Sequence, residues 1–498
     1  MKGKITVKAL AFVVAAAILS SAFAGCNSKP VNTPSEPASS ADGISTTGAT
    51  ETLTSMEGTA TSVESGGNTA STSADATTGR TTTKAGGTQK TTTKNGGDSK
   101  PTTTAKKPTA ATTTTTRKTT TTAKAQNQER ISFYKNMIKN ESDWLVTLQL
   151  DNGAVGMTND TWQRTINPYF AEITMLALLD SGKTYANNVK KYMNWHFGHL
   201  NTAAEDYNGV DGTIYDYEIV STGAGTTNVV SETVKYSNNG KPQYDSTDSY
   251  AALFLSVLWR YYEETGDAAY IKAHYSDINR IVNALFATMD NGLTWAKPDY
   301  RVKYFMDNAE VYEGLADAAK LYEKVLVPAF SSGSSEKAGA SAKLKQITDG
   351  RDLVYATIEK VLWNEKGGYY YASCTGSSSV ASFSWNTFYA DATCQAFALS
   401  TGLLDPKSER AQRIWKNFNS HYAGQGKQHN WPGFDIPDSF YWGVLAYAGS
   451  LAGDAENVDA YTKLYMSYPA KKHNWPLYNA DCAQAIRAAH VMLEYYGG

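Results

Sequence analysis

The sequence has few cysteines and lacks several common catalytic signatures. Cys26 lies near the N-terminus, and Cys374, Cys394 and Cys482 follow much later. The three cysteines that remain after Cys26 are an odd number, which in a chain this long is no disulfide framework. Cys394 and Cys482 each fall just inside an apolar helical segment, where a thiol usually acts as a small buried hydrophobe. The sequence also has no G-x-S-x-G, no phosphate-binding glycine loop and no C-x-x-C, so none of these motifs points to a function.

The N-terminal apolar segment is short. "ALAFVVAAAILSSAFA" (9–24) follows three lysines within the first eight residues, and it is too short to span a bilayer comfortably. The charged start, short apolar core and "FAGC" resemble a bacterial lipoprotein signal. This resemblance implies that residues 1–25 are removed and that Cys26 carries a lipid that holds the protein at the outer face of the membrane. The alternative is an ordinary cleaved signal and a secreted protein.

Residues 27–125 have almost no large apolar side chains. They are rich in Thr, Ser, Gly, Ala and Pro, and "TTTK" recurs among them. Such a segment cannot bury enough surface to offset its ordering entropy, so we predict a disordered linker. Residues 80–124 contain ten Lys or Arg and the single acid Asp98. A basic tether beyond a membrane anchor suits contact with an anionic cell wall. Export argues against nucleic acid, the other partner of basic segments.

The remaining residues, 126–498, contain two kinds of helical segment. One kind is nearly apolar all round, which is typical of a helix buried between layers. Six segments are of this kind: 167–182, 244–267, 304–325, 385–404, 434–454 and 477–498.

Helices of the second kind alternate with these six and have one apolar stripe. In 341–363, for example, Leu344, Ile347, Val354, Ile358 and Val361 recur at helical spacing, as on a helix packed on one side only. The other striped segments are 128–148, 184–200, 269–290, 406–422 and 455–466. Six alternations of striped and buried helices predict an all-α double ring, an (α/α)6 toroid. We interpret 331–343 ("SSGSSEKAGASAK") and 220–242 as loops.

This helix pattern resembles the six-hairpin glycosidase superfamily over nearly all of 126–498. "YDSTDSYAALFLSVLWRYYEETGD" (244–267) is similar to the Y-x-S-x-D-A helix of debranching-enzyme and trehalase-like domains, with Ser249 where those domains have Ala. The resemblance implies hydrolysis of glycosidic bonds in a cleft at one mouth of the toroid, mostly with inversion. It does not specify the sugar.

The tetrapeptide HNWP occurs at 429–432 and again at 473–476, each time before a buried helix. Proline and the restricted residue before it keep each tryptophan in an extended loop. "SFSWNTFYAD" places Trp385 at a third similar position. Because tryptophan faces stack on the apolar faces of sugar rings, we expect Trp431, Trp475 and Trp385 to bind substrate, helped by His429. The alternative is that the two HNWP tryptophans are packing anchors.

Acidic residues recur at the starts of the buried helices. Asp245 and Asp248 share one helical face, as do Asp307 and Glu310, and adjacent repeats place the two pairs near one another. Glycosidic hydrolysis needs a protonated carboxyl group and a second carboxylate. We therefore predict Asp248 and Glu310 as the leading acid and base, followed by Asp245 and Asp307.

Helix capping is the structural alternative for these acids. Asp438 and Asp481 are the next candidates, because a late repeat can supply the base in the resembled superfamily. Tyr244, among several tyrosines on the approach to the second buried helix, is a further substrate-binding candidate.

We therefore predict an extracellular glycoside hydrolase that needs no cofactor. His196 and His199 alone lack the third ligand that a zinc site requires. One alternative is a polysaccharide lyase on the same toroid, in which Arg301, Lys303, His429 and His473 would act. The other is a non-catalytic sugar-binding lipoprotein.

Overall fold

The computed structural model describes residues 114–159, 165–222, 229–423, 431, 442–467, 473 and 476–498. The signal segment, Cys26 and nearly all of the predicted linker lie outside these residues, so lipid attachment stays a prediction. Within the described residues, no helix combines the length and apolar character needed to cross a bilayer.

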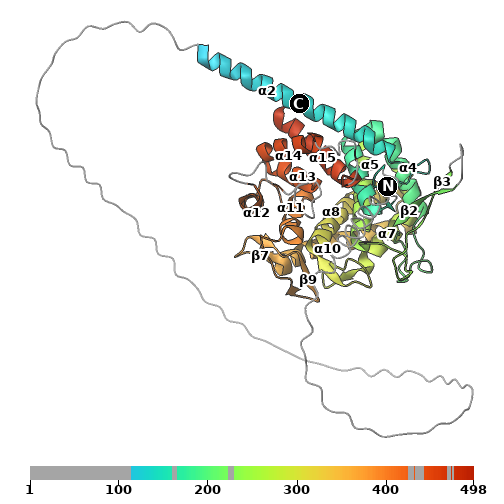
Figure 1. Ribbon diagram of the computed structural model, residues 1–498. Coiled ribbons are helices and arrows are strands. Elements are labelled where there is room, and N and C mark those ends of the chain that lie inside the picture. The colour runs from blue at the N-terminus through green and yellow to red at the C-terminus, as the bar shows by residue number, and fades with distance from the viewer. Residues whose placement is uncertain are drawn as a thin grey trace, which may run out of the picture. The chain divides into compact units, whose positions relative to one another are not determined.

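Six inner helices form a closed ring. Each contacts the next in chain order, and the last, α15, contacts the first, α3 (Figure 1). Their bounds are α3 Pro168–Asp180, α5 Thr247–Thr265, α8 Phe305–Leu321, α11 Cys394–Ser400, α13 Gly443–Ala452 and α15 Asn479–Tyr496. These helices match the six predicted buried segments, and α5 is buried on all sides along most of its length.

The outer helices cover this ring. α2 packs on α15, α4 on α3 and α5, α7 on α5, α10 on α8, α12 on α11 and α13, and α14 on α13 and α15. Their bounds are α2 Thr114–Thr147, α4 Ala186–Gly198, α7 Tyr275–Ala287, α10 Ser335–Thr357, α12 Glu409–Tyr422 and α14 Ala455–Ser467. In α7, Ile278, Ile281, Val282 and Leu285 form the buried stripe, as expected of a helix packed on one side. The predicted all-α toroid is confirmed.

Short elements complete the connections. The helical ones are η1 Lys183–Tyr185, α6 Ala268–Ala273, η2 Tyr322–Leu326, α9 Val327–Ala329, η3 Ile358–Leu362 and η4 Phe388–Ala392. The strands are β1 Thr165–Ile166, β2 Tyr217–Thr222, β3 Val229–Val234, β4 Met289–Asp290, β5 Leu293–Thr294, β6 Val302–Tyr304, β7 Trp363–Asn364, β8 Tyr369–Tyr370, β9 Ser373–Thr375 and β10 Ser379–Val380.

Three local predictions need correction. Most of 331–343 is helical, because the Ser334 side chain accepts the Lys337 N–H and begins α10 at Ser335. Residues 220–242 are not simply a loop, since β2 and β3 pair antiparallel within and beside them; their β-branched residues favour strands. α2 begins at Thr114, inside the predicted linker, because extending an existing helix costs far less than starting one.

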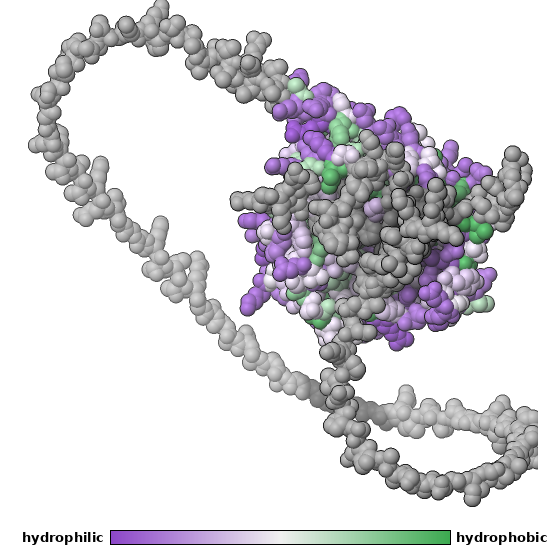
Figure 2. All heavy atoms as spheres, in the orientation of Figure 1, coloured by the Kyte–Doolittle hydropathy of each residue, from purple (hydrophilic) through white to green (hydrophobic). Residues whose placement is uncertain are grey.

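α5 and α8 approach one another closely. A side-chain carbon placed on Gly314 of α8 would lie 2.4 Å from the backbone oxygen of Ala252 in α5. The missing side chain therefore lets the two backbones touch, which fixes the helices that carry the predicted carboxylates. On the described surface visible in Figure 2, hydrophilic residues predominate and hydrophobic patches are small.

Candidate active site

Four carboxylates converge where α5 and α8 begin. Ser246, the residue before α5, donates its hydroxyl to Asp248 Oδ1 at 2.7 Å and lies 3.3 Å from Asp307 Oδ2. The charges of Asp248, Glu310 and Asp245 all act on Asp307. The predicted grouping of Asp245, Asp248, Asp307 and Glu310 therefore exists in the structure.

Asp248 is completely buried and closely held. It accepts hydrogen bonds from Ser246, from the Ser249 N–H at 2.9 Å and from the Thr294 hydroxyl at 2.6 Å. Burial raises the pKa of Asp248 to about 6, against the lowering effect of these hydrogen bonds. With both oxygens bonded and no exposed surface, Asp248 is placed to position its neighbours.

Glu310 lies one helical turn after Asp307. It is 4% exposed and accepts a 2.6 Å hydrogen bond from the Tyr169 hydroxyl. Burial, with the nearby charges of Glu313 and Asp248, raises the pKa of Glu310 to about 8, although the bond from Tyr169 lowers it. A carboxyl group with this pKa is protonated at neutral pH.

Asp307 lies among other acidic side chains. Burial first, and then the charges of Asp248, Glu310 and Asp245, raise the pKa of Asp307 well above its usual range. Its side chain remains slightly exposed, at 8%. Asp307 and Asp248 flank one serine hydroxyl, and two carboxylates that share a site do not both ionise readily.

Asp245 is exposed to solvent, yet desolvation by the surrounding protein raises its pKa. Lys297 and Lys235 act in the opposite direction on Asp245, because their positive charges favour its ionised form. Burial raises the pKa of both Asp245 and Glu310, but the two lysines oppose the rise at Asp245, whereas nearby carboxylates add to it at Glu310.

A buried network supports the backbone at Asp245. The Tyr250 hydroxyl accepts the Asp245 N–H at 3.2 Å and donates to Asp216 Oδ1 at 2.8 Å. Asn167 donates to both Tyr250 and Asp216. Burial raises the pKa of Asp216 to about 7. The sequence reasoning missed Asp216 because it lies in a connection and not at the start of a buried helix.

Aromatic side chains line the approach to the carboxylates, and three of them were not predicted. Burial, then the charges of Asp307 and Asp245, raise the pKa of Tyr389. Its ring stacks on Trp442 with centroids 5.4 Å apart, and Tyr169 reaches Glu310. Tyr389 lies in "SFSWNTFYAD", so that motif did carry a signal, but we expected Trp385 to be its functional residue.

The expectation that Trp431 is a sugar platform is wrong. Trp431 is 2% exposed, its indole N–H donates to Asn419 Oδ1 at 2.9 Å, and its ring packs edge-on against Trp415 and Tyr461. The Trp431 ring is thus enclosed by other side chains. Trp431 is the packing anchor that the alternative interpretation of HNWP proposed.

Tyr244 is also not available to a substrate. It is 3% exposed, and its ring clusters with those of Tyr207 and Tyr215 at centroid distances of 5.2 and 5.4 Å. Its hydroxyl accepts a 2.7 Å hydrogen bond from Asn208. A tyrosine in this position stabilises the connection before α5, because its face and its polar end already have partners.

Of the remaining predicted binding residues, the structure describes Trp385 and Asp481. Trp385 is partly buried and stacks on His421. Asp481, at the start of α15, is buried, and its Oδ1 accepts the Gly443 N–H at 3.1 Å. Its Oδ2 has no hydrogen-bond partner among the described residues, and burial raises its pKa well above the usual range. Trp475, His429 and Asp438 lie outside the described residues.

The basic residues that a lyase would use are largely occupied by structural contacts. Lys303 is 1% exposed, and its Nζ donates to the Asp290 carboxylate and to two backbone oxygens. His473 Nε2 lies 2.8 Å from Glu141, and its ring stacks on Trp144. Arg301 lies over the ring of Trp295. His473 thus anchors its loop to α2.

Neither predicted histidine is part of a metal centre in the described part of the chain. His196 is buried against the ring of Phe254, and His199 lies near Glu232. The described residues contain no cluster of three or more His, Cys, Asp or Glu side chains arranged to hold a metal ion.

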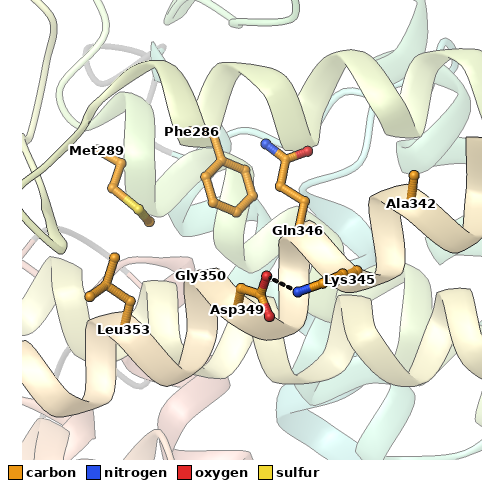
Figure 3. Close-up of a pocket in the computed structure, with 8 residues that line it drawn as sticks. All are labelled: Phe286, Met289, Ala342, Lys345, Gln346, Asp349, Gly350 and Leu353. Atoms are coloured by element: carbon orange, nitrogen blue, oxygen red, sulfur yellow. Dashed lines mark hydrogen bonds and ion pairs between the residues drawn. The ribbon is translucent and has the colours of Figure 1, made fainter. Parts of the chain in front are cut away.

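A groove of about 440 Å³ lies elsewhere, between α7 and α10. Phe286, Met289 and Leu353 form its apolar wall, and Lys345 pairs with Asp349 at its rim (Figure 3). A side-chain carbon on Gly350 would lie 2.6 Å from the Phe286 ring, so the groove follows from packing of that ring on α10. The four carboxylates at the starts of α5 and α8 do not line this groove.

No protein-family model and no curated protein matches this sequence. Similar solved structures include "Glycosidase Wild Type", which is 12% identical with a TM-score of 0.46 over 73% of this chain and 98% of that one. A rhamnosidase from Klebsiella oxytoca with rhamnose bound is 13% identical, with a TM-score of 0.43 over 72% and 64%. An inactive variant of the alpha-1,6-mannanase GH76A of Salegentibacter sp. HEL1_6, in complex with alpha-1,6-mannotriose, is 10% identical, with a TM-score of 0.42 over 72% and 99%.

Proposed function

We propose that this protein is a glycoside hydrolase that cleaves a poly- or oligosaccharide at the mouth of the toroid. The observation that carries the proposal is the convergence of Asp245, Asp307 and Glu310 beside Tyr389 and Trp442. Carboxyl groups for acid and base catalysis and aromatic rings for sugar faces are the groups that glycosidic hydrolysis requires.

Glu310 is the proposed general acid. Its pKa of about 8 keeps the proton available at neutral pH, and Tyr169 fixes the orientation of the carboxyl group. In the reaction the proton moves from Glu310 to the glycosidic oxygen as the bond from that oxygen to the anomeric carbon breaks. Proton donation of this kind contributes about 10²–10⁴-fold to a rate.

Asp245 is the proposed general base. It is accessible to water, and Lys297 and Lys235 favour its carboxylate form. Asp245 would remove a proton from the water that attacks the anomeric carbon. Pairs of carboxyl groups whose environments separate their pKa values commonly divide the roles of acid and base. Asp248 and Asp307 then form a coupled pair that holds Ser246 between them.

We further propose that the reaction inverts the anomeric configuration, the course that the resemblance to six-hairpin glycosidases implies. In an inverting enzyme the acid and base stand apart by roughly 6.5–9.5 Å, with room for a water molecule. Proton NMR of the first product formed distinguishes the two courses, and a product with retained configuration would refute inversion without refuting hydrolysis.

The test of hydrolysis is release of reducing sugar by the full chain from α- and β-glucans, xylan, mannan and pectin. Glu310→Gln and Asp245→Asn should each lower the rate by about 10²–10⁴-fold while polysaccharide binding persists. Asp349→Asn is the matched control, since this carboxylate lies on the far surface of α10 and should retain full activity. No release from any substrate, with binding retained, would favour the non-catalytic sugar-binding protein.

The lyase alternative has less support, because Lys303 and His473 are held in structural contacts. Elimination yields an unsaturated product that absorbs ultraviolet light, so absorbance during the same assay tests it. Increased absorbance without the ordinary hydrolysis product would overturn the hydrolase proposal.

We also propose export, with a lipid on Cys26 and the basic 27–125 segment leading through an anionic cell wall. This proposal rests on the sequence alone, since Cys26 and residues 27–113 lie outside the described part. Labelled palmitate should enter the wild-type protein and not Cys26→Ala. Equal labelling of both proteins would refute the anchor.

A further inference from the structure

A continuous row of aromatic rings leads away from the proposed active site. It begins with Tyr389 and Trp442, whose rings stack. Phe388 meets Trp442 edge-on and also meets Tyr422 edge-on, each with centroids 5.4 Å apart. The Tyr422 hydroxyl then donates to the backbone oxygen of Trp385 at 2.6 Å. All five side chains are partly buried and partly exposed.

The row continues with two further rings, Phe383 and Tyr369, which are also partly exposed. The Trp385 ring meets Phe383 edge-on at 5.2 Å, and Phe383 stacks on Tyr369 with centroids 3.6 Å apart and ring planes 8° from parallel. Phe383 and Tyr369 are not among the partly buried hydrophobic residues that pack against the core. Core packing therefore does not account for this pair.

The segment that carries the outer rings is made of small polar residues. "GSSSVASFSWN" (376–386) contains Phe383 and Trp385, with Ser382, Ser384 and Asn386 exposed around them. The Asp391 carboxylate accepts the Ser384 N–H at 2.8 Å, which ties this segment to η4, the turn that also holds Tyr389. The segment that carries Phe383 and Trp385 is thus held to the turn that carries Phe388 and Tyr389 by a hydrogen bond from its backbone as well.

We propose that this row binds successive sugar rings of a glycan chain, so that the substrate is a polysaccharide extending beyond the carboxylates. The inference rests on the proposed function for its ligand class. Aromatic rings offer large apolar faces at little conformational cost, which suits the apolar faces of pyranose rings. The exposed serine and asparagine side chains beside them can bond sugar hydroxyls. Phe383 and Tyr369 follow the other five rings in the row, so we expect them to contact sugar units beyond those held at the carboxylates.

The test measures binding without cleavage, in the full chain carrying Glu310→Gln. Affinity electrophoresis through gels containing each polysaccharide gives a dissociation constant. Phe383→Ala and Tyr369→Ala should each weaken polymer binding by about tenfold, whereas Phe383→Tyr should bind like the parent. Tyr495→Ala is the matched control, because Tyr495 is 59% exposed on α15 and lies outside the row. Near-ultraviolet circular dichroism verifies that each variant is folded.

The outcomes separate this inference from the proposed function. Equal polymer binding by all variants, or no polymer binding by the parent, overturns the row as a glycan site even if the active protein releases reducing sugar. Loss of binding in both alanine variants, with Phe383→Tyr and Tyr495→Ala unaffected, supports it even if no hydrolysis occurs. In active protein, Phe383→Ala should also raise the KM for the polymer relative to the KM for a trisaccharide.

Discussion

Replacing Glu310 by glutamine should make the protein more stable at alkaline pH while lowering its activity by about 10²–10⁴-fold. Glutamine has nearly the shape of the protonated glutamic acid, and its side-chain oxygen can still accept the hydrogen bond from Tyr169. It cannot ionise. The change therefore removes the unfavourable effect of ionising a carboxyl group that is 4% exposed.

The size of the effect follows from the pKa. Folding raises the pKa of Glu310 from 4.5 to about 8, chiefly by burial, and each pKa unit corresponds to about 1.4 kcal/mol. Ionisation of Glu310 thus costs the folded state on the order of 5 kcal/mol. Below pH 4.5 the group is protonated in both states and has no such cost. Between pH 4.5 and 8 only the unfolded chain ionises, so stability falls as pH rises, and above pH 8 the loss is complete.

The assay is urea unfolding of both proteins at several pH values between 5 and 9. The free energy of unfolding of the parent should fall by about 1.4 kcal/mol per pH unit relative to Glu310→Gln between pH 5 and about 8, and the difference should then become constant. Asp248 and Asp307 titrate in both proteins, so only the difference between the two curves is assigned to Glu310. Parallel curves would show that Glu310 is ionised in the folded protein and would refute its assignment as the acid.

Three further predictions concern single side chains. Tyr169→Phe removes the bond that lowers the pKa of Glu310, so the alkaline limb of the pH–rate profile should move to higher pH; an unmoved limb would contradict this. Gly314→Ala should destabilise the fold by about 3 kcal/mol by separating α5 from α8, whereas Gly339→Ala, on exposed α10, should stabilise it by about 0.5–1 kcal/mol, both measured by urea unfolding. Trp431→Ala should cost about 3–5 kcal/mol of stability; a loss of sugar binding at unchanged stability would restore Trp431 as a platform.

The ring could be predicted because its signal lies in burial patterns. A helix enclosed by others, such as α5, needs apolar residues on every side, whereas α7 needs only a stripe. The two patterns alternate along the sequence, so the order of inner and outer helices could be predicted from them. The start of α10 was missed because a serine cap at Ser334 looks like loop composition until its hydrogen bond is seen.

The candidate site was only partly predictable. The acids at the starts of α5 and α8 could be grouped because their spacing places them on shared faces. Their separate roles depend on exposure and on partners distant in sequence, such as Tyr169 for Glu310 and Lys297 for Asp245. Trp431 shows the same limit, because a loop tryptophan looks alike whether its ring faces a cleft or the core. In the structure, the low exposure of Trp431 and the hydrogen bond from its indole to Asn419 show that the ring belongs to the core.

The closure of the ring has a consequence for synthesis. α15 packs against α2, α3, α13 and α14, and the Tyr134 hydroxyl of α2 bonds Asp459 at the far end of the chain. A growing chain on the ribosome has made α3 long before α15, the helix that packs on it, exists. Native contacts of such wide sequence separation form late, and the apolar faces stay open to chaperones and proteases until then. Ribosome-bound chains stalled before α15 should therefore be cut by protease at the inner helices, and protection should appear only once this helix has emerged.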